Sequence, residues 1–270
     1  MPAPRTDIET FKISSNETPF EPPDSVRRAI EQAAATVHRY PDPFSRRLTG
    51  ALARRFDVNQ EQISLGTGSV AVVGQLIWAA AGPGDSVVYP WRSFEAYPIW
   101  VQMTGARSVQ VPLLADERHD LPSMLKAIDD STRIVFVCNP NNPTGEAVRR
   151  DELTEFIDAV PSDVIVVLDE AYREFISDTD VPDGLDFFHE RNNVVVIRTF
   201  SKAYGLAGLR VGFAIAPEPI AEGMRKTALP FGVSSIAEDA ALAALECEDE
   251  LFERVRHLSE ERDRVWQALA

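Results

Sequence analysis

The stretch Val194–Arg210, VVVIRTFSKAYGLAGLR, decides how the rest of the chain is interpreted. It begins with four β-branched residues in a row, a pattern typical of a buried strand in a parallel sheet. Ligands of open α/β sheets bind beyond the carboxyl ends of the strands, where this stretch carries Thr199, Ser201, Lys202 and Arg210. Two hydroxyls and a guanidinium favour a phosphate. A lysine desolvated among cationic groups has a lowered pKa, which makes Lys202 a candidate Schiff-base lysine. A surface loop whose lysine points into water would explain a Ser-Lys pair on its own.

The composition indicates a globular protein with a large core, because 44% of its 270 residues are hydrophobic and 26% are charged. The net charge of −15 disfavours nucleic acid and anionic membrane surfaces as partners. No apolar run reaches the ~20 residues of a membrane span, and the first residues lack the apolar segment of a signal peptide. Two distant cysteines and four histidines without a close pair predict neither a disulfide framework nor a zinc site. We therefore expect a cytoplasmic protein.

Hydrophobic periodicity and turn residues predict alternating helices and strands after an extended, proline-rich arm over residues 1–23. Asp24 is expected to cap the first helix. The expected strands are 63–65, 86–89, 106–111, 134–138, 164–168, 194–199 and 211–216. The expected helices are 25–37, one ending at Phe56, 70–81, one starting near Ser93, 121–128, 150–160, 218–227 and 236–270. This alternation favours an α/β protein with a parallel sheet.

A glycine turn, Gly66-Thr67-Gly68-Ser69, separates the first expected strand from an apolar helix. Gly66, Gly68 and Ala71 occupy the glycine positions of a dinucleotide-binding fingerprint. That fingerprint also needs an acid at the end of the second strand, whereas this strand ends in Pro90-Trp91, so a nicotinamide site is disfavoured. What remains is either a phosphate site at a helix amino terminus or a tight turn without a ligand.

Polar residues follow two further apolar strands of the expected sheet. Asn142 comes after the fourth strand, and Asp169 and Tyr172 come after the fifth. Taken alone, Asp169 would simply cap the next segment. Because parallel strands end at one edge, we expect these side chains and Lys202 to meet in one crevice. The set suits pyridoxal 5'-phosphate. Asp169 would keep the ring nitrogen protonated, while Tyr172 and Asn142 would form hydrogen bonds with the ring oxygen.

With these residues in place, the sequence resembles the fold-type I, class I/II aminotransferases, close to the histidinol-phosphate and aromatic aminotransferases. The resemblance runs from the arm to the end of the chain. The motifs that carry it are Asn16-Glu17-Thr18-Pro19, Arg39-Tyr40-Pro41-Asp42, Asn141-Asn142-Pro143-Thr144-Gly145, Asp169-Glu170-Ala171-Tyr172, Ser201-Lys202-Ala203 and Gly208-Leu209-Arg210. It implies a pyridoxal-phosphate-dependent transaminase that acts on amino acids and 2-oxo acids.

The resemblance also implies the architecture. We expect a three-layer α/β/α sandwich around a mostly parallel central sheet, with the small C-terminal domain largely missing. Residues 1–23 would form the arm, residues 24–235 the large cofactor-binding domain, and residues 236–270 the start of the helix that leads to the small domain. In the family, the segment beyond that helix carries the arginine that binds the substrate carboxylate. We therefore expect this chain to bind the cofactor but to transaminate poorly.

Individual roles follow from the resemblance. The implied catalytic residues are Lys202, Asp169 and Tyr172, and the further cofactor ligands are Asn142, Thr199, Ser201 and Arg210. Amides or a hydroxyl of the turn would bind the phosphate, from Gly68, Ser69 and Val70. Phe94 would stack on the ring, with Tyr97 as the alternative.

The implied partner is a second copy of the chain. Tyr40 would reach the cofactor phosphate of the neighbouring subunit, so that the active sites of a homodimer lie at its interface. Asn16 and Phe20 would line the substrate pocket.

Two departures from the histidinol-phosphate enzymes bear on the substrate. Residues 16–20 read NETPF where those enzymes usually have Asn-Glu-Asn-Pro followed by Tyr or Leu. Residues 91–97 lack their usual Pro-Thr before the stacking aromatic and are similar instead to aromatic aminotransferases. We therefore expect transfer of an amino group from an aromatic amino acid to 2-oxoglutarate. The alternatives are histidinol-phosphate transamination, decarboxylation of a phosphorylated amino acid, and a catalytically incomplete fragment.

Overall fold

A single mixed sheet organises the fold. The computed structural model describes residue 12 and residues 14–269, so most of the expected arm, residues 1–11 and 13, lies outside the described residues. The strands are β1 (Ile63–Gly66), β2 (Ser86–Trp91), β3 (Arg107–Pro112), β4 (Thr132–Cys138), β5 (Ile165–Asp169), β6 (Val194–Thr199) and β7 (Gly212–Ile215). The helices are α1 (Asp24–Ala34), α2 (Arg46–Phe56), α3 (Ser69–Ala80), α4 (Ala96–Thr104), α5 (Leu121–Lys126), α6 (Arg150–Ala159), α7 (Gly184–Phe188), α8 (Glu218–Thr227), α9 (Ser235–Glu246) and α10 (Glu248–Leu269).

The strand order is β1-β7-β6-β5-β4-β2-β3. Strands β2 to β6 are parallel to their neighbours among themselves, and β7 is antiparallel to both β6 and β1. Because β1 opposes β7, it points the same way as the parallel strands. The carboxyl ends of β1, β4, β5 and β6 therefore share one edge, where Gly212 pairs with Gly66 on one side and Thr199 on the other. This register places the glycine turn after β1 beside the lysine loop after β6.

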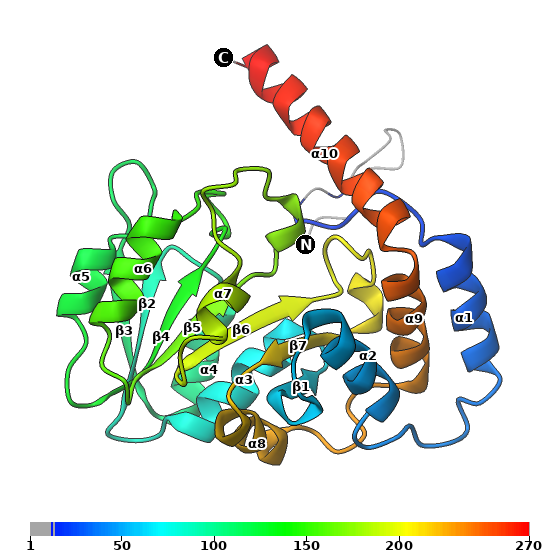
Figure 1. The fold of residues 1–270 in the computed structure, drawn as a ribbon, viewed down its shortest axis with the longest axis horizontal. Helices are drawn as coiled ribbons and strands as arrows, with labels where there is room; N and C mark the ends of the chain where they lie inside the picture. The colour runs from blue at the N-terminus through cyan, green and yellow to red at the C-terminus, as the bar shows by residue number, and fades with distance from the viewer. Residues whose placement is uncertain (1–11, 13, 270) are drawn as a thin grey trace, which may run out of the picture.

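Helices cover both faces of the sheet and complete the three-layer sandwich that the resemblance implies (Figure 1). Helices α3, α4 and α8 pack on one face in a core that includes Phe136 and Ile197. Helices α1, α2, α5, α6, α7 and α9 pack on the other face in a core that includes Val137 and Val196. Successive strand residues point to opposite faces, so strands that are apolar throughout supply both cores.

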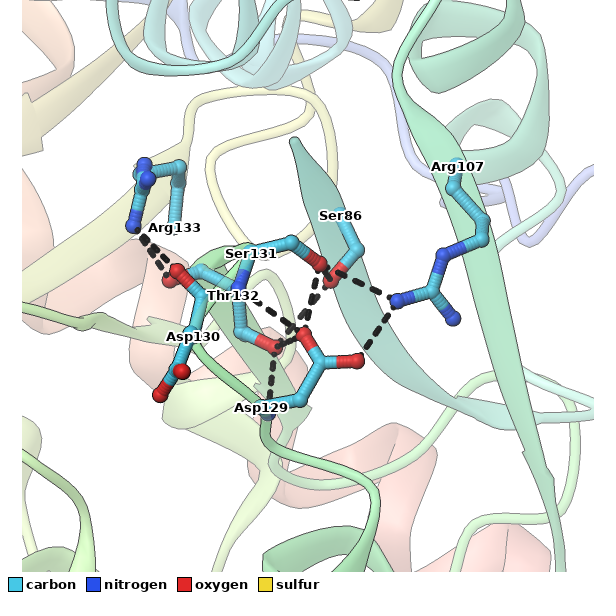
Figure 2. A network of polar contacts seen from close by, with 7 residues as sticks. All are labelled: Ser86, Arg107, Asp129, Asp130, Ser131, Thr132 and Arg133. Atoms are coloured by element: carbon cyan, nitrogen blue, oxygen red, sulfur yellow. Dashed lines mark hydrogen bonds and ion pairs between the residues drawn. The ribbon is translucent and has the colours of Figure 1, made fainter. Parts of the chain in front are cut away.

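A polar network joins the amino ends of β2, β3 and β4 at the opposite edge of the sheet (Figure 2). Arg107 Nη2 donates to Asp129 Oδ2 at 2.7 Å and to Ser131 Oγ at 3.1 Å. The hydroxyls of Ser86 and Thr132 lie 3.1 Å apart. Hydrogen bonds from Ser131 and then Arg107 lower the pKa of Asp129 to about 2. The carboxylate therefore stays ionised, and the network fixes the starts of these strands at all but strongly acidic pH.

Several boundaries differ from the expected ones. Asp24 begins α1 instead of capping it, and its carboxylate accepts a hydrogen bond from Arg27 Nη2 at 2.8 Å. Helix α4 begins at Ala96, three residues later than expected, and the hydroxyl of Ser93 donates to Asn141 Oδ1 at 2.8 Å. The short helix α7 was not expected, because its five residues are too few to show a helical period.

The expected single terminal helix is two helices, α9 and α10, which meet at Cys247. The break places Glu248 where its carboxylate accepts from Arg55 Nε at 2.8 Å and from the Tyr204 hydroxyl at 2.6 Å. Figure 1 shows α10 extending away from the sheet, and Trp266 near its end is 74% exposed. None of the described helices combines the length and the apolar character needed to cross a membrane.

Candidate active site

A cavity of about 460 Å³ lies at the carboxyl edge of the sheet. Its walls come from the amino-terminal segment, the start of α3, and the segments that follow β2, β4, β5 and β6. The sequence-predicted residues that line it are Asn16, Ser69, Val70, Phe94, Asn142, Asp169, Tyr172, Thr199, Ser201, Lys202 and Arg210. The strand ends thus bring together side chains that are up to 194 residues apart in sequence (210 − 16).

Lys202 lies on the loop after β6 and is partly buried. Its Nζ donates to the backbone carbonyls of Ser15 at 3.0 Å and Asn16 at 3.2 Å. Burial lowers the pKa of Lys202, Glu17 acts in the opposite direction, and the positive charge of Arg210 lowers the pKa further. More of the amine is therefore neutral at a given pH than in an ordinary lysine, as a nucleophile requires.

Ser201, Arg210 and the start of α3 form an anion-binding corner of the cavity. Arg210 Nη1 donates to Ser201 Oγ at 3.3 Å and to the carbonyl of Ala207 at 2.9 Å. Among the described residues, the amides of Ser69 and Val70 in the first turn of α3 have no hydrogen-bond partner. A helix amino terminus with free amides, a hydroxyl and a guanidinium are the groups that bind a phosphate.

Gly68 leaves room for the Arg210 guanidinium in this corner, but its amide is not free to bind a phosphate. Its φ of 81° lies in the left-handed region, and its amide donates to the carbonyl of Gly66 at 2.8 Å within the turn. The implied hydrogen bond from the Gly68 amide to a phosphate is therefore not available in this conformation. A Cβ at Gly68 would overlap the Arg210 guanidinium, and a Cβ at Gly212 would overlap the backbone of Ser69. Gly212 requires glycine because the backbones approach so closely there, and Gly68 favours glycine because of its left-handed φ.

Asp169 is the last residue of β5 and is only 2% exposed. Its Oδ2 accepts from the Tyr97 hydroxyl at 2.7 Å, and its Oδ1 accepts from the amide of Ala171 at 3.3 Å. Burial raises the pKa of Asp169, and the hydrogen bond from Tyr97 opposes that rise. A buried acid at the wall of a cavity pairs strongly with a cation, such as a protonated ring nitrogen.

Tyr172 and Asn142 face the same cavity from neighbouring loops. The Tyr172 hydroxyl accepts from Asn16 Nδ2 at 3.0 Å, and burial raises the pKa of Tyr172, so the phenol keeps its proton. The loop that carries Asn142 is fastened by Asn139, whose Nδ2 donates to the carbonyl of Val148 at 3.1 Å and whose Oδ1 accepts from the Val148 amide at 2.8 Å. Both side chains can donate a hydrogen bond to an oxygen in the cavity.

The two aromatic candidates for ring stacking have different positions. Phe94 lines the cavity, whereas Tyr97 is fully buried beneath it. Their rings meet edge to face, with centroids 5.7 Å apart and planes at 90°. Only Phe94 of this pair can cover a ligand's face, so the alternative assignment of stacking to Tyr97 does not fit the structure.

Two predicted residues lie outside the cavity. The side chain of Tyr40 is 85% exposed, and its ring contacts Phe231 with centroids 4.9 Å apart. The ring of Phe20 lies near two residues of α10, 6.1 Å from the ring of His257 and 5.7 Å below the guanidinium of Arg254. The structure does not bring Phe20 together with Asn16 at the cavity. Phe20 packs instead against α10, a helix whose position the sequence did not define.

Cavity residues that sequence reasoning missed include Ser15, Ser93 and Cys138. Ser15 acts through its carbonyl, which no side-chain pattern reveals. Cys138 ends β4 and pairs in the ladder with Asp169 of β5, so its place at a strand end was the available signal. No three His, Cys, Asp or Glu side chains within residue 12 and residues 14–269 are grouped as a metal site would require.

A buried ion cluster fixes the loop that follows Asp169. Arg198 Nη2 donates to Glu170 Oε2 at 2.7 Å and to Asp183 Oδ1 at 2.6 Å, and Glu170 Oε1 accepts from the amide of Gly184 at 2.7 Å. The side chains of Arg198 and Glu170 are 8% and 2% exposed. Burial raises the pKa of Glu170, and the charge of Arg198 opposes that rise. The cluster therefore holds β6 and the segment after β5 in one arrangement.

Replacing Arg198 with methionine is expected to lower the free energy of unfolding by about 3–5 kcal/mol, because Glu170 would remain buried without its cation. Arg107→Met is the matched control, since Arg107 is 56% exposed in its ion pair and should change stability far less. Urea unfolding of both variants measures the difference. Equal destabilisation would mean that the buried cluster adds nothing beyond a surface ion pair.

The donor set of the cavity fits pyridoxal 5'-phosphate. The Ser201 and Arg210 corner suits the phosphate, Asp169 the ring nitrogen, Tyr172 and Asn142 the ring oxygen, and the Lys202 amine the aldehyde. The volume of about 460 Å³ lies within the range of ~300–1,000 Å³ that is usual for small-molecule sites.

Comparison with known proteins points to the same chemistry. Residues 8–270 match the family model described as aminotransferase class I and II. The aromatic amino acid aminotransferase of Streptomyces coelicolor is 61% identical over 259 residues, which are 96% of this chain and 72% of that protein. The protein of the same name from Thermobifida fusca is 56% identical over 263 residues, 97% of this chain and 73% of that protein.

Solved structures share the fold. The histidinol-phosphate aminotransferase from Sinorhizobium meliloti, in complex with pyridoxal-5'-phosphate, has a TM-score of 0.87 at 34% identity and matches 93% of this chain and 68% of its own. A putative histidinol-phosphate aminotransferase from Erwinia carotovora atroseptica has a TM-score of 0.90 at 25% identity. The match covers 95% of this chain and 75% of that protein.

Proposed function

Because this chain belongs to the family of class I and II aminotransferases and is a pyridoxal-phosphate-dependent enzyme, we propose that it transfers an amino group from an aromatic amino acid to 2-oxoglutarate. Relatives that are 47–61% identical over nearly the whole chain carry the name aromatic amino acid aminotransferase. The structural observation that carries the proposal is an apolar recess directly beside Lys202.

The recess has a volume of about 200 Å³. Phe175, Leu258 and Tyr172 supply its apolar and aromatic lining, and the remaining lining residues are Asn16, Glu17, Thr18 and Lys202. Lys202 is the cation among its lining residues. A phenyl or indole side chain suits such a recess, whereas the phosphate of histidinol phosphate would face the Glu17 carboxylate, which already pairs with Lys12 Nζ at 3.0 Å. The recess therefore favours an aromatic donor over the phosphorylated one.

Each residue of the main cavity then has a role. When bound, pyridoxal phosphate supplies a ring that withdraws electrons from the substrate Cα. Lys202 would hold the cofactor through its aldehyde carbon, with loss of water, and would move the Cα proton once its amine is free; Asp169 would hold a proton on the ring nitrogen, and Tyr172 and Asn142 would donate to the ring oxygen. Phe94 excludes water from one ring face.

The phosphate end has its own set of residues. Ser201 and Arg210 bind the phosphate with the start of α3, where Ser69 and Val70 offer amides. Thr199 fixes the loop that carries them, since its hydroxyl accepts from the Ser201 amide at 3.1 Å. These anchors hold the cofactor in register with Lys202.

Steady-state kinetics with several donors tests the substrate. The kcat/KM for phenylalanine should exceed that for histidinol phosphate by about 10²-fold, since an unpaired phosphate is costly in an apolar recess. Phe175→Ala should lower kcat/KM for phenylalanine by about tenfold or more but hardly affect aspartate, while Trp266→Ala, on the exposed end of α10, should affect neither.

The outcomes separate the alternatives. Faster turnover of histidinol phosphate would favour that transaminase, and release of carbon dioxide from a phosphorylated amino acid would favour a decarboxylase. Cofactor binding without any turnover would favour a catalytically incomplete chain.

We also propose a homodimer whose active sites lie at the interface. A second cavity of about 760 Å³ is lined by Phe44, Trp78 and Met103, which are 52–63% exposed. Tyr40 and Leu229 add further exposed apolar surface, at 85% and 71%. Contiguous apolar surface of this kind is characteristic of protein interfaces. In such a dimer Tyr40 would reach the partner's cofactor phosphate, since it does not line the cavity of its own chain.

The free thiols of Cys138 and Cys247 support a cytoplasmic location for the protein.

Mixing two impaired variants tests the shared site. Tyr40→Ala and Lys202→Ala should each be impaired alone, and refolding them together should restore part of the activity, because mixed dimers contain one intact site. A mixture that is no more active than its components, or a monomer by sedimentation equilibrium, would contradict the proposal.

A further inference from the structure

Tyr97 of α4 makes the shorter of the two hydrogen bonds that the described residues donate to the Asp169 carboxylate. Its hydroxyl lies 2.7 Å from Asp169 Oδ2, whereas the Ala171 amide lies 3.3 Å from Oδ1. Tyr97 is 0% exposed and Asp169 is 2% exposed, so no solvent competes for this contact. A phenol that donates to a carboxylate stabilises the ionised form over the neutral acid.

The Tyr97 ring is held in one orientation by aromatic neighbours. It stacks on Phe136 of β4, with centroids 4.5 Å apart and planes at 24°. Tyr89 and Phe94 meet it edge on, each with its centroid 5.7 Å away. Because these contacts fix the ring, the hydroxyl is aimed at Asp169 before any ligand arrives.

Two other ionisable groups of the described residues lie near enough to Asp169 for its charge to raise their pKa values, Cys138 of β4 and Tyr172 after β5. Burial raises the pKa of Cys138 to about 12 and also raises the pKa values of Tyr97 and Tyr172. All three groups are therefore neutral near pH 7. The Cys138 thiol donates to the carbonyl of Pro140 at 3.4 Å, which leaves the Tyr97 phenol as the side-chain donor to Asp169.

We propose that Tyr97 is a positioning residue that orients Asp169 and keeps it ionised toward the cofactor's ring nitrogen. The inference rests on the proposed role of Asp169 and extends it to a residue that touches neither cofactor nor substrate. The sequence offered Tyr97 only as the alternative to Phe94 for ring stacking, whereas this proposal gives the role to its hydroxyl.

A double-mutant cycle tests the inference. The variants are Tyr97→Phe and Asp169→Asn, alone and combined, with Tyr89→Phe as the matched control. Tyr89 is equally buried and contacts the same aromatic cluster, but its hydroxyl donates to Ser108 Oγ at 2.9 Å. The first readout is the protonation midpoint of Asp169 in the ligand-free chain. It is monitored through the carboxyl infrared band that disappears in Asp169→Asn. The second is the dissociation constant of pyridoxal phosphate, and the third is kcat.

Tyr97→Phe should raise the protonation midpoint of Asp169 by about one pH unit or more, because the carboxylate loses the hydrogen bond that stabilises it over the neutral acid. It should lower kcat by about tenfold or more and raise the dissociation constant of the cofactor by a smaller factor. In the Asp169→Asn background the same substitution should have little further effect on kcat. Replacing Tyr97 with 3,5-difluorotyrosine, a stronger donor of nearly the same shape, should move the midpoint downward.

Three results would overturn the inference: an unchanged midpoint in Tyr97→Phe, equal effects of Tyr97→Phe and Tyr89→Phe, or an undiminished effect in the Asp169→Asn background. If Asp169→Asn itself leaves kcat unchanged, the proposed role of Asp169 fails instead. The two failures are therefore distinguishable.

Discussion

Replacing Lys202 with alanine should lower the rate of transamination by about 10⁴-fold or more, because the chain then lacks the amine that bonds the cofactor and moves the Cα proton. Cofactor affinity should fall much less, since Ser201, Arg210 and the start of α3 remain to hold the phosphate. Single-turnover kinetics and equilibrium dialysis separate the two effects. A variant with near-normal turnover would remove Lys202 from the mechanism.

The chain offers a sharp chemical check on this assignment, because it contains four lysines, Lys12, Lys126, Lys202 and Lys226. Borohydride reduction of the cofactor-loaded protein should attach the label to Lys202, the lysine that lines the cavity. Lys226→Ala is the matched control, since Lys226 is 72% exposed and pairs with Glu222 at 2.7 Å. That variant should keep both label and turnover. A label on any other lysine would show that the assignment is wrong.

The pH dependence of cofactor attachment should reflect the surroundings of Lys202. The neutral amine is the reactive form, so the attachment rate should rise with pH through the pKa of Lys202, which burial lowers below the usual range of a lysine. Glu17 raises this pKa, so Glu17→Gln should move the midpoint of the rise to lower pH. Stopped-flow mixing of ligand-free protein with cofactor over a pH series measures it. A midpoint that moves upward in Glu17→Gln would contradict the stated electrostatics.

The strands and their polar ends were predictable because the local signal is strong there. The runs at 164–168 and 194–197 are apolar on both faces, as is typical of buried parallel strands, and each is followed by the polar residues that reach the cavity. Parallel pairing then brings Asp169 and Lys202 to one edge without knowledge of any helix. This part of the site depends on the chain direction and on little else.

The contacts that the sequence did not reveal depend on helix packing. Tyr97 and Asp169 are 72 residues apart, and their hydrogen bond exists because α4 packs on the sheet face beneath the cavity. The position of Phe20 depends on the break at Cys247, which directs α10 past the amino-terminal segment. Neither periodicity nor residue type specifies the angle of a helix against a sheet, so these placements required the structure.

Replacing Asp169 with asparagine is expected to lower kcat by about 10²–10³-fold, because an amide cannot hold a proton on the cofactor's ring nitrogen as the substrate Cα loses its own. The substitution keeps the size of the side chain and can keep one acceptor for the Tyr97 hydroxyl. The dissociation constant of the cofactor should therefore rise by about tenfold at most, the value of one hydrogen bond among several anchors. The effect should fall mainly on kcat, measured with saturating cofactor and phenylalanine.

The control for this prediction is Asp163→Asn, an exposed acid beside the opposite end of β5. It should leave both kcat and cofactor affinity unchanged, because its charge lies at the far edge of the sheet from the cavity. Comparable losses in the two variants would point to a general effect of negative charge in a protein that carries −15, and not to a buried partner for the ring nitrogen. A large loss of cofactor affinity with normal kcat would reverse the assignment and make Asp169 an anchor. The expected division, a large change in kcat and a small one in affinity, follows from a charge that is needed when the proton moves and not when the ring docks.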